Sequence, residues 1–264
     1  MGKTEPAVRW EREGPVGVLI LDRPGCKNAL TLESRDELVA AVERLASERD
    51  LRAAIVCGAG GAFCAGGDLE GLAERARGFQ ARGGVRPLFS NRLARALLAV
   101  EVPLIAAVAG PAVGAGLAVC LACDLRIASE DARFAAGATR AGLSPEYGTS
   151  FLLPRTVGRS LAAAMILCGH TLDAAEAFGA GLVTEVVQGR DLMARARELA
   201  GGIAAQAPVA VRLAKRALLG AMDATLEGAL AIEELAATHS LSSDDHLEAV
   251  SALLEKRPPR FSDR

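Results

Sequence analysis

Two glycine-rich segments are the part of this sequence best suited to chemistry. They are AFCAGGDL at residues 62–69 and AGPAVGAGLAVCLACDL at residues 109–125. Each has small residues where a short strand is expected to turn into a helix, which leaves backbone N–H groups uncovered for a ligand. A helix N-terminus also carries a partial positive charge. Two such ends that converge would form an oxyanion hole, which stabilises negative charge on a carbonyl oxygen.

Other interpretations of these segments compete with this one. For either segment alone, glycines that only allow close packing of a helix on a strand are the simpler explanation. A dinucleotide-binding fingerprint fits poorly. The third glycine position holds Val119 after Gly114 and Gly116. It holds Phe63 after Gly58 and Gly60. A serine hydrolase is unsupported, because the chain has no G-x-S-x-G motif.

The two segments lie within an alternation of strands and helices. Apolar runs predict strands at residues 8–12, 16–21, 53–57, 104–109 and 125–128, and the first two read as a hairpin. Periodicity predicts helices at residues 30–49, 88–100 and 114–123, the first beginning near Thr31. Residues 74–86, with several arginines among glycine and alanine, predict a mobile loop or a frayed helix. The alternation indicates an α/β core.

The later part of the chain has a different pattern. From residue 160 onward it reads as nearly all helical, with helices expected at residues 171–178, 191–206, 208–219, 225–239 and 244–255. The change falls between residues 190 and 210, so we expect a core over residues 1–200 and a helical region over residues 201–264. Continuous apolar faces on such a region need a partner surface, which predicts an oligomer.

Composition excludes several classes of protein. A formal net charge of −2 gives no basis for a nucleic-acid partner. The chain begins with a polar stretch rather than a signal-peptide pattern, and no long apolar run is free of charge, proline and glycine, so we expect a cytoplasmic protein without a membrane span. The six cysteines, at positions 26, 57, 64, 120, 123 and 168, are then expected to be reduced. Cys120 and Cys123 have no second pair or nearby histidine, which favours core packing, and we expect no metal.

Taken in order, six segments resemble the enoyl-CoA hydratase/isomerase family, the crotonases. They are LDRPGCKNALT at 21–31, AFCAGGDL at 62–69, AVAGPAVGAGLAVCLACDLRIASEDARF at 107–134, GLSPEYGTSFLLPRTVGRSLA at 142–162, AAEAFGAGLVTEVV at 174–187 and LLEKRPPRF at 253–261. The resemblance covers nearly the whole chain. It implies an α/β fold built as a spiral of ββα repeats, with a helical C-terminal region that forms trimers or dimers of trimers (hexamers).

The resemblance also implies an acyl-CoA thioester as ligand and a place in fatty acid metabolism, with coenzyme A as part of the substrate and no separate cofactor. The oxyanion donors would be the backbone N–H groups of Gly67 and Ala115. Arg23 and Lys27 would contact phosphates or remain solvated charges, and the arginines between residues 75 and 95 would shield the phosphates or form a solvated face. The other expected contacts to the thioester come from residues of the same segments: Cys26, Ala29, Ala65, Asp68, Leu69 and Gly114. Asp68 is also expected to cap a helix.

The sequence departs from the family pattern at two positions. Hydration of a double bond needs one group to deprotonate water and another to protonate the α-carbon. In the family's hydratases two glutamates do this, and the matching positions here hold Ala118 and Ala138. Alanine cannot transfer a proton, so hydration by the two-glutamate route is not expected.

One carboxylate remains nearby, that of Glu146 in GLSPEYG. It falls where some isomerases of the family carry a catalytic acid, and an apolar pocket around it would raise its pKa. The competing interpretation is a helix start, with Ser144 as N-cap and Glu146 in the first turn. Tyr147 either packs or donates a hydrogen bond near the pocket.

Several functions therefore stay open at this stage. Double-bond isomerisation with Glu146 as the single acid/base fits best. The alternatives are hydration with a relocated acid/base group, decarboxylation, thioester hydrolysis, a non-catalytic acyl-CoA-binding protein, and a subunit of a mixed oligomer that has lost its ligand.

Overall fold

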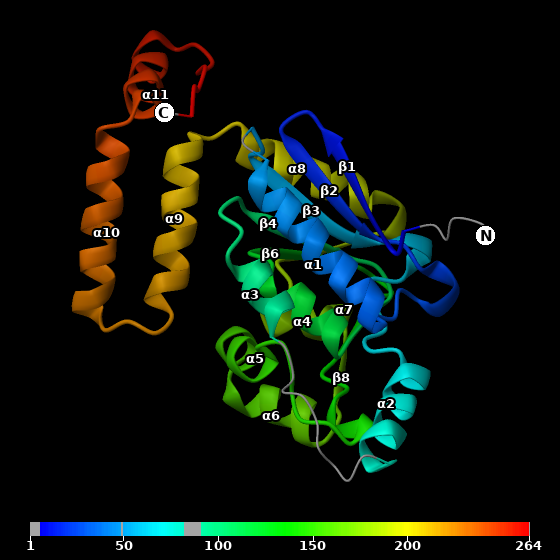
Figure 1. Ribbon diagram of the computed structural model, residues 1–264. Helices are drawn as coiled ribbons and strands as arrows, with labels where there is room; N and C mark the ends of the chain where they lie inside the picture. Colours follow the sequence, from blue (N-terminus) through cyan, green and yellow to red (C-terminus); the bar gives the residue numbers. More distant parts are fainter. Residues whose placement is uncertain (1–5, 49, 82–90, 264) are drawn as a thin grey trace.

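The structure is a computed structural model that describes residues 6–48, 50–81 and 91–263 (Figure 1). A six-stranded sheet has the order β1-β2-β3-β4-β6-β9. Its strands are β1 (Val8–Glu13), β2 (Val16–Leu21), β3 (Ala53–Gly58), β4 (Leu104–Val108), β6 (Leu125–Ser129) and β9 (Glu185–Val187). A second sheet has the order β5-β7-β8, with strands β5 (Pro111–Val113), β7 (Arg133–Ala135) and β8 (Thr171–Asp173).

Side-chain alternation divides the core into two layers on either side of the large sheet. Ala53, Ile55 and Cys57 of β3 face one layer, and Ala54 and Val56 face the other. Helix α8 (Leu192–Ala204) covers the first layer, and α1 (Leu32–Ser47), α3 (Arg92–Leu98) and α4 (Ala115–Ala122) cover the second. Because both faces are covered, the central strands are almost wholly apolar, as buried parallel strands must be.

The predicted elements of the first half are confirmed with small shifts at their ends, except that residues 49 and 88–90 of the predicted helices lie outside the described residues. The hairpin forms by antiparallel pairing of β1 with β2. The Thr31 hydroxyl accepts a hydrogen bond from the Ser34 N–H, and the Ser34 side chain accepts one from the Thr31 N–H, so a capping box starts α1. Among residues 74–86, those up to Ala81 belong to helix α2 (Leu69–Ala81) rather than to a loop, and the rest lie outside the described residues.

Two predictions for the second half are wrong in part. Residues 171–178 are not one helix, because Thr171–Asp173 forms strand β8 and only Ala174–Gly179 forms helix α7. Strand β9 interrupts the region expected to be all helical, where it pairs with β6. Both strands have only three residues, which are too few to show the alternation of apolar and polar residues that predicts a strand.

The C-terminal helices form an arm beside the sheets (Figure 1). Helices α9 (Pro208–Ala221) and α10 (Leu226–Leu241) lie side by side, and α11 (Asp244–Glu255) follows near the chain end. The domain boundary near residue 200 and the oligomer stay predictions. No helix of the described residues is long and apolar enough to cross a membrane.

The cysteines follow the packing interpretation. Cys120 and Cys123 are buried in the larger core cluster, and all six cysteines are free thiols. Burial raises the pKa of the Cys120 thiol to about 12, which keeps it protonated and inert at neutral pH. Within the described residues, no group of three or more His, Cys, Asp or Glu side chains is arranged to hold a metal.

Candidate active site

The two glycine-rich segments lie against each other. The backbone of Cys64 pairs with β5, because its N–H donates to the Pro111 carbonyl (2.9 Å) and its carbonyl accepts from the Val113 N–H (2.9 Å). A Cβ on Gly116 would lie only 2.3 Å from the Cys64 carbonyl oxygen. A Cβ on Gly66 would lie 2.7 Å from the Val113 carbonyl oxygen. Glycine is therefore needed on both sides for this close approach.

This contact brings two backbone donors together. Leu30 N–H donates to the Gly66 carbonyl (2.7 Å), and Asp68 N–H donates to the Leu30 carbonyl (3.0 Å). In this parallel bridge the intervening Gly67 N–H points away from Leu30. Ala115 is the first residue of α4, so its N–H has no partner within the helix. Neither donor has an acceptor among the described residues.

Ala118 and Ala138, where the resemblance leads us to expect glutamates, lie near the second donor. The Ala118 N–H donates to the Gly114 carbonyl (3.0 Å), which places Ala118 one turn into α4. Gly137 packs on Gly114, since a Cβ on Gly137 would lie 3.3 Å from the Gly114 nitrogen, and Ala138 follows it. Neither position offers an ionisable side chain.

Glu146 does not start a helix, so the helix-start interpretation of residues 144–146 is wrong. Helix α5 spans Thr149–Val157 and has Gly148 as its N-cap. The Glu146 carbonyl instead accepts hydrogen bonds from the N–H (3.0 Å) and the hydroxyl (2.8 Å) of Thr149. The glutamate is thus held in an irregular loop before the helix, and its carboxylate does not serve the first turn.

The environment of Glu146 raises the pKa of its carboxyl group. Partial burial is the main cause, and the positive charges of Arg75 and Arg35 oppose it. A carboxyl group whose pKa lies above its usual range is better suited to exchanging protons near neutral pH than an ordinary solvated one.

Tyr147 fixes this loop. It is buried in the larger core cluster, in agreement with the packing interpretation, and burial raises the pKa of its phenol, although a hydrogen bond with Arg35 lowers it. Its φ of +52° is uncommon for a bulky residue. Strain of this kind persists only where surrounding packing imposes it, and it accumulates at functional sites.

The segment expected to bracket the ligand is tied together internally. Asn28, which we did not single out from the sequence, is buried and donates its side-chain amide to the carbonyls of Ala59 (3.0 Å) and Ala62 (2.6 Å). Arg23 donates to the Ala29 carbonyl (2.6 Å). The N–H groups of Cys26, Ala29 and Ala65 all donate to carbonyls within residues 23–27 (2.9–3.1 Å), so they are already engaged. Lys27 is exposed.

Asp68 is a helix cap, as expected. Its carboxylate accepts a hydrogen bond from the Gly71 N–H (2.8 Å) at the start of α2. Leu69, the first residue of that helix, is 70% exposed. Leu72 packs beside Gly67, 3.3 Å from the place of its missing Cβ, so α2 is anchored next to one of the two donors.

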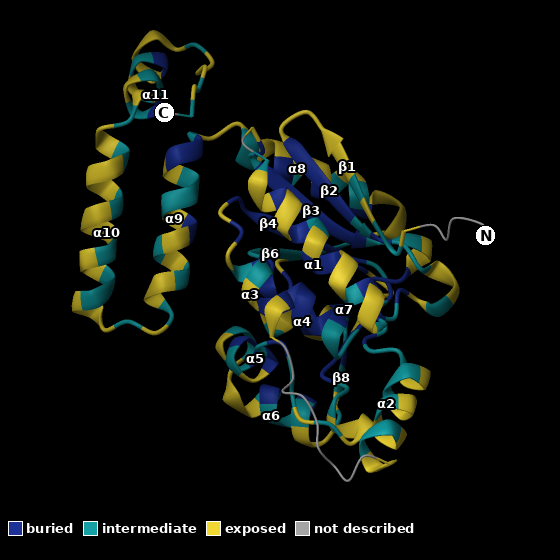
Figure 2. Ribbon diagram, in the orientation of Figure 1, coloured by how far each residue is buried: buried dark blue, intermediate teal, exposed yellow. Residues whose placement is uncertain are grey.

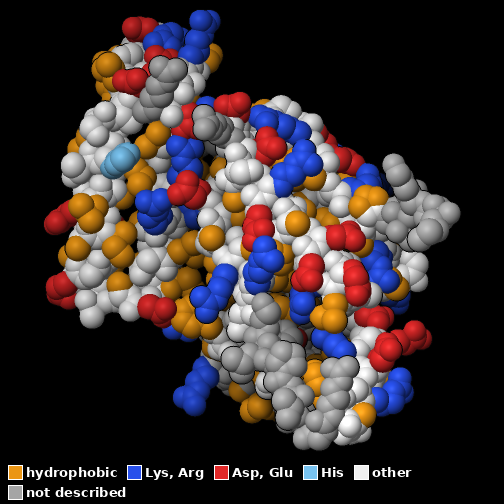
Figure 3. Space-filling model, viewed as in Figure 1, with side chains coloured by type: hydrophobic (Ala, Val, Ile, Leu, Met, Phe, Trp, Pro, Cys, Tyr) orange, Lys and Arg blue, Asp and Glu red, His pale blue; other side chains and the backbone are white. Residues whose placement is uncertain are grey.

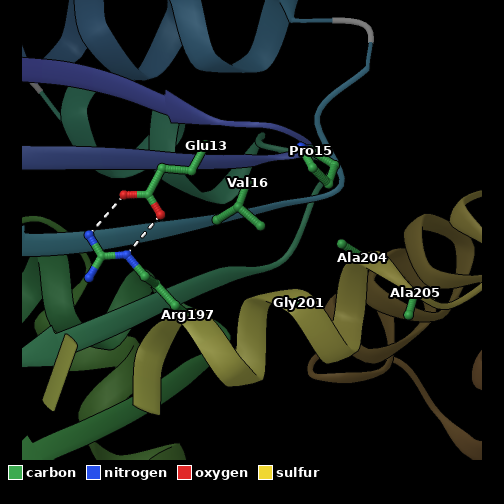
Figure 4. A pocket seen from close by; sticks show the side chains of 7 residues that line it. All are labelled: Glu13, Pro15, Val16, Arg197, Gly201, Ala204 and Ala205. Carbon is green, nitrogen blue, oxygen red and sulfur yellow. Dashed lines mark hydrogen bonds and ion pairs between the residues drawn. The ribbon is translucent and has the colours of Figure 1, made fainter. Parts of the chain in front are cut away.

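Two of the hollows in the described surface bear on the position of the site. One, of about 600 Å³, lies between the start of α1 and α2, and Asp68 and Arg75 are among its lining residues, although Glu146 is not. The other, of about 410 Å³, lies between the β1–β2 turn and α8 (Figure 4). There Arg197 forms a two-pronged ion pair with Glu13, and none of the predicted site residues takes part. The first hollow is lined by Asp68, the residue after Gly67, but neither Gly67 nor Ala115 is among its described lining residues.

Comparison with known proteins identifies the family. The family model described as enoyl-CoA hydratase/isomerase matches residues 11–264. This chain belongs to the enoyl-CoA hydratase/isomerase family. The resemblance to the crotonase family that the sequence indicated is thereby confirmed. The expected crotonase-like α/β fold with helices at the C-terminus is confirmed as well.

Members of the enoyl-CoA hydratase/isomerase family resemble the chain over nearly all of its length. The short-chain-enoyl-CoA hydratase of Clostridium acetobutylicum is 36% identical over 248 residues, covering 94% of each chain. The 2,3-dehydroadipyl-CoA hydratase of Escherichia coli is 36% identical and covers 96% of this chain and 97% of its own. The crystal structure of an enoyl-CoA hydratase from Bacillus anthracis superposes with a TM-score of 0.89 at 32% identity, covering 98% of this chain and all of the other.

Proposed function

We propose that this protein binds acyl-CoA thioesters and isomerises the double bond of enoyl-CoA substrates, with Glu146 as the single acid/base. The N–H groups of Gly67 and Ala115 would hold the thioester oxygen. The observation that carries the proposal is the partly buried Glu146 carboxyl group with its raised pKa, in a site where positions 118 and 138 hold alanine.

Such a site needs one proton-transfer group and one pair of donors. The Glu146 carboxylate removes a proton from the carbon beside the thioester, and the electron pair moves onto the thioester oxygen as an enolate. The two N–H groups stabilise that oxyanion. Protonated Glu146 then returns the proton further along the chain, which moves the double bond without a change in mass.

Hydration is the second candidate, because the Clostridium and Escherichia relatives are named hydratases. It requires a group that activates water and another that protonates the α-carbon. Glu146 alone supplies one of these, and Ala118 and Ala138 supply neither. A hydratase would therefore need a second, unassigned acid/base group.

The purified protein should be incubated with 2-enoyl-, 3-enoyl- and dienoyl-CoA esters and followed by mass spectrometry and ultraviolet absorbance. We expect migration of the double bond at constant mass. A gain of one water would favour the hydratase. Binding without turnover of any ester would favour a non-catalytic acyl-CoA-binding protein and contradict the proposal. A thioester that breaks down or loses carbon dioxide would point to hydrolysis or decarboxylation.

Glu146→Gln is the decisive variant. Loss of a general acid/base is expected to lower kcat by about 100- to 10,000-fold, while the affinity for a saturated acyl-CoA should stay within a few fold. Glu130→Gln, in the exposed turn after β6, is the matched control and should keep full activity. Activity of Glu146→Gln within a few fold of the unaltered protein would show that Glu146 is not the acid/base.

The pH dependence gives an independent readout of the same group. Burial raises the pKa of the Glu146 carboxyl group, and only its ionised form can act as the base. In the unaltered protein kcat/KM should therefore rise with pH through a pKa above the usual glutamate range and fall as pH drops below it. Glu146→Gln should lose this step in its residual activity.

A further inference from the structure

The donor segment at residues 62–69 contains two consecutive glycines, Gly66 and Gly67. Glycine is the most flexible residue, because it has no Cβ to restrict its backbone. An N–H group stabilises an oxyanion well only when its direction is fixed before the negative charge develops. Gly66 is buried and has a φ of +96°, and Gly67 is partly exposed. Contacts from other residues must therefore hold Gly66 in place if the Gly67 N–H is to serve as a donor.

The Gly66 carbonyl group is held by Leu30, whose N–H donates to it over 2.7 Å. In a planar trans peptide the N–H of one residue points opposite to the carbonyl of the residue before it. The hydrogen bond from Leu30 therefore also sets the direction of the Gly67 N–H. One end of Gly66 is fixed in this way, and its other end depends on what binds its own N–H.

The Gly66 N–H is held by the thiol of Cys64. The Cys64 sulfur accepts this N–H over 3.4 Å and donates its own hydrogen to the Asn28 carbonyl over 3.1 Å. The side chain thus imitates the turn that Asn and Asp form, in which a side chain binds the backbone N–H two residues further on. Burial raises the pKa of the Cys64 thiol to about 12, so its hydrogen is present at neutral pH. One thiol therefore joins Gly66 to Asn28.

Asn28, which anchors the thiol, is itself held on all sides. It is 1% exposed, and its side-chain amide donates to the carbonyls of Ala59 (3.0 Å) and Ala62 (2.6 Å). Its side-chain oxygen accepts a hydrogen bond from the Arg23 N–H (2.8 Å). A buried polar group that loses its partners costs free energy, so these bonds resist any shift of Asn28. The carbonyl that receives the Cys64 thiol is therefore a fixed point.

The Cys64 side chain also lies against the second donor segment. The Cys64 backbone pairs with Pro111 and Val113 of β5. A Cβ on Gly116 would lie 2.7 Å from the Cys64 Cβ, and Gly116 directly follows Ala115, the second donor. Cys64 thus joins the two donor segments through its side chain as well as its backbone.

We propose that Cys64 is a positioning residue of the oxyanion hole, whose thiol fixes the Gly66–Gly67 peptide so that the Gly67 N–H meets the thioester oxygen. The inference rests on the proposed binding of an acyl-CoA thioester at Gly67 and Ala115. In this role the thiol exchanges no proton and acts only through the Gly66 N–H. Loss of the thiol should therefore weaken the polarisation of the thioester carbonyl and leave the affinity for the ester largely unchanged.

The test measures the carbonyl stretching frequency of a bound saturated acyl-CoA, isotopically labelled at the thioester carbonyl carbon, by difference infrared spectroscopy. Isomerisation cannot consume a saturated ester, so the bound state is observed apart from catalysis. Donors on the oxygen weaken the C=O bond, and binding to the unaltered protein should shift the band to lower frequency. Cys64→Ala should lose most of this shift, while its Kd for the ester stays within a few fold.

The kinetics of Cys64→Ala should agree with the spectrum. We expect kcat to fall by about tenfold or more, which is less than the effect of removing a complete oxyanion donor. KM should change little, because the contacts that bind the ester in its ground state remain. A purely structural loss would instead lower the fraction of folded protein and leave the band of the bound ester unchanged.

Two further variants control the experiment. Cys120→Ala removes the same sulfur atom from an equally buried position of the same core cluster and should retain the full shift. Cys64→Ser keeps a hydroxyl that can donate to Asn28, but it reaches less far toward Gly66, because a C–O bond is shorter than a C–S bond and the thiol contact is already 3.4 Å. This variant should retain only part of the shift, and it decides the question if Cys64→Ala does not fold.

The outcomes separate the positioning role from the proposed function. A full shift in Cys64→Ala or in Cys64→Ser would overturn the role of the thiol while leaving acyl-CoA binding intact. An equal loss in Cys120→Ala would also overturn it, because general loosening of the core would then be the cause. A bound ester without any shift in the unaltered protein, or an ester that does not bind at all, would overturn the proposed function itself.

Discussion

The site-bearing core and the C-terminal arm are stabilised in different ways. In the core, strands β3 and β4 and helix α4, which adjoin the glycine-rich segments, are almost wholly buried, and backbone approaches backbone closely at Gly66 and Gly116. In the arm, α10 has no buried residue in the single chain (Figure 2). Apolar side chains lie open along α9 and α10 (Figure 3). The exposed leucines of the arm include Leu218, Leu226, Leu235, Leu241, Leu253 and Leu254.

The two regions differ in how much of their apolar surface one chain covers. The core covers most of its own apolar surface and positions the two backbone donors with contacts inside the chain. The arm has exposed apolar side chains, and we predict from this patch that the arm meets a partner surface. The two regions are joined at Lys215 of α9, which donates to the Val102 carbonyl (2.9 Å) and to Asp124 (2.7 Å).

The largest effect is expected where the two glycine-rich segments touch. Gly116→Ala places a methyl group 2.3 Å from the Cys64 carbonyl oxygen, and the backbone there has to move. We expect a loss of about 3 kcal/mol or more in the free energy of unfolding, together with loss of acyl-CoA binding. Urea unfolding and ligand titration measure both.

Gly201→Ala, in α8, is the control for that substitution. A Cβ at Gly201 meets nothing within 4 Å. Alanine there should stabilise the protein by about 0.5–1 kcal/mol through helix propensity. If Gly116→Ala changed the free energy of unfolding no more unfavourably than Gly201→Ala does, the close approach of Gly116 to the Cys64 carbonyl would not require glycine.

A smaller effect is expected at the joint between core and arm. Lys215→Met keeps the aliphatic part of the side chain but removes the ammonium group that pairs with Asp124. The Asp124 carboxylate then keeps only its hydrogen bond from the Leu104 N–H (2.7 Å). Because Lys215 is 7% exposed and Asp124 only 25%, we expect a loss of about 2–3 kcal/mol on urea unfolding. Arg216→Met breaks the exposed pair with Glu101 and should cost less than about 1 kcal/mol. Equal losses of unfolding free energy in Lys215→Met and Arg216→Met would show that the buried Lys215–Asp124 pair stabilises the protein no more than the exposed Arg216–Glu101 pair.

The smallest effect on the isolated chain is expected on the outer face of the arm. Leu235 and Leu253 are 75% and 78% exposed, so replacing both with serine should change the stability of a monomer by less than about 0.5 kcal/mol per site. If a second copy covers these side chains, the double variant should instead lower the mass found by sedimentation. Leu167→Ser, at an equally exposed site outside the arm, should not change it. Unchanged mass in the double variant would exclude these leucines from the interface.

Local signals were sufficient for much of the fold. Thr31 and Asp68 begin helices as their side-chain chemistry predicts, and the apolar runs at residues 16–21 and 53–57 form adjacent strands. The three-residue strands β8 and β9 were missed, because pairing with distant strands rather than local alternation forms them. Asn28 was missed because its partners lie more than thirty residues away.

The sequence by itself determined the family, the two donor segments and the absence of a carboxylate at positions 118 and 138, because residue identity and order carry each of these. Only the tertiary structure decided that Glu146 lies in a loop before α5 rather than in its first turn, because the left-handed backbone of Tyr147 and Gly148 delays the helix until Thr149. It likewise decided that Arg75 lies beside Gly71 at the hollow between α1 and α2. The direction of a long side chain and the burial of a carboxyl group depend on segments that meet only when the chain is folded.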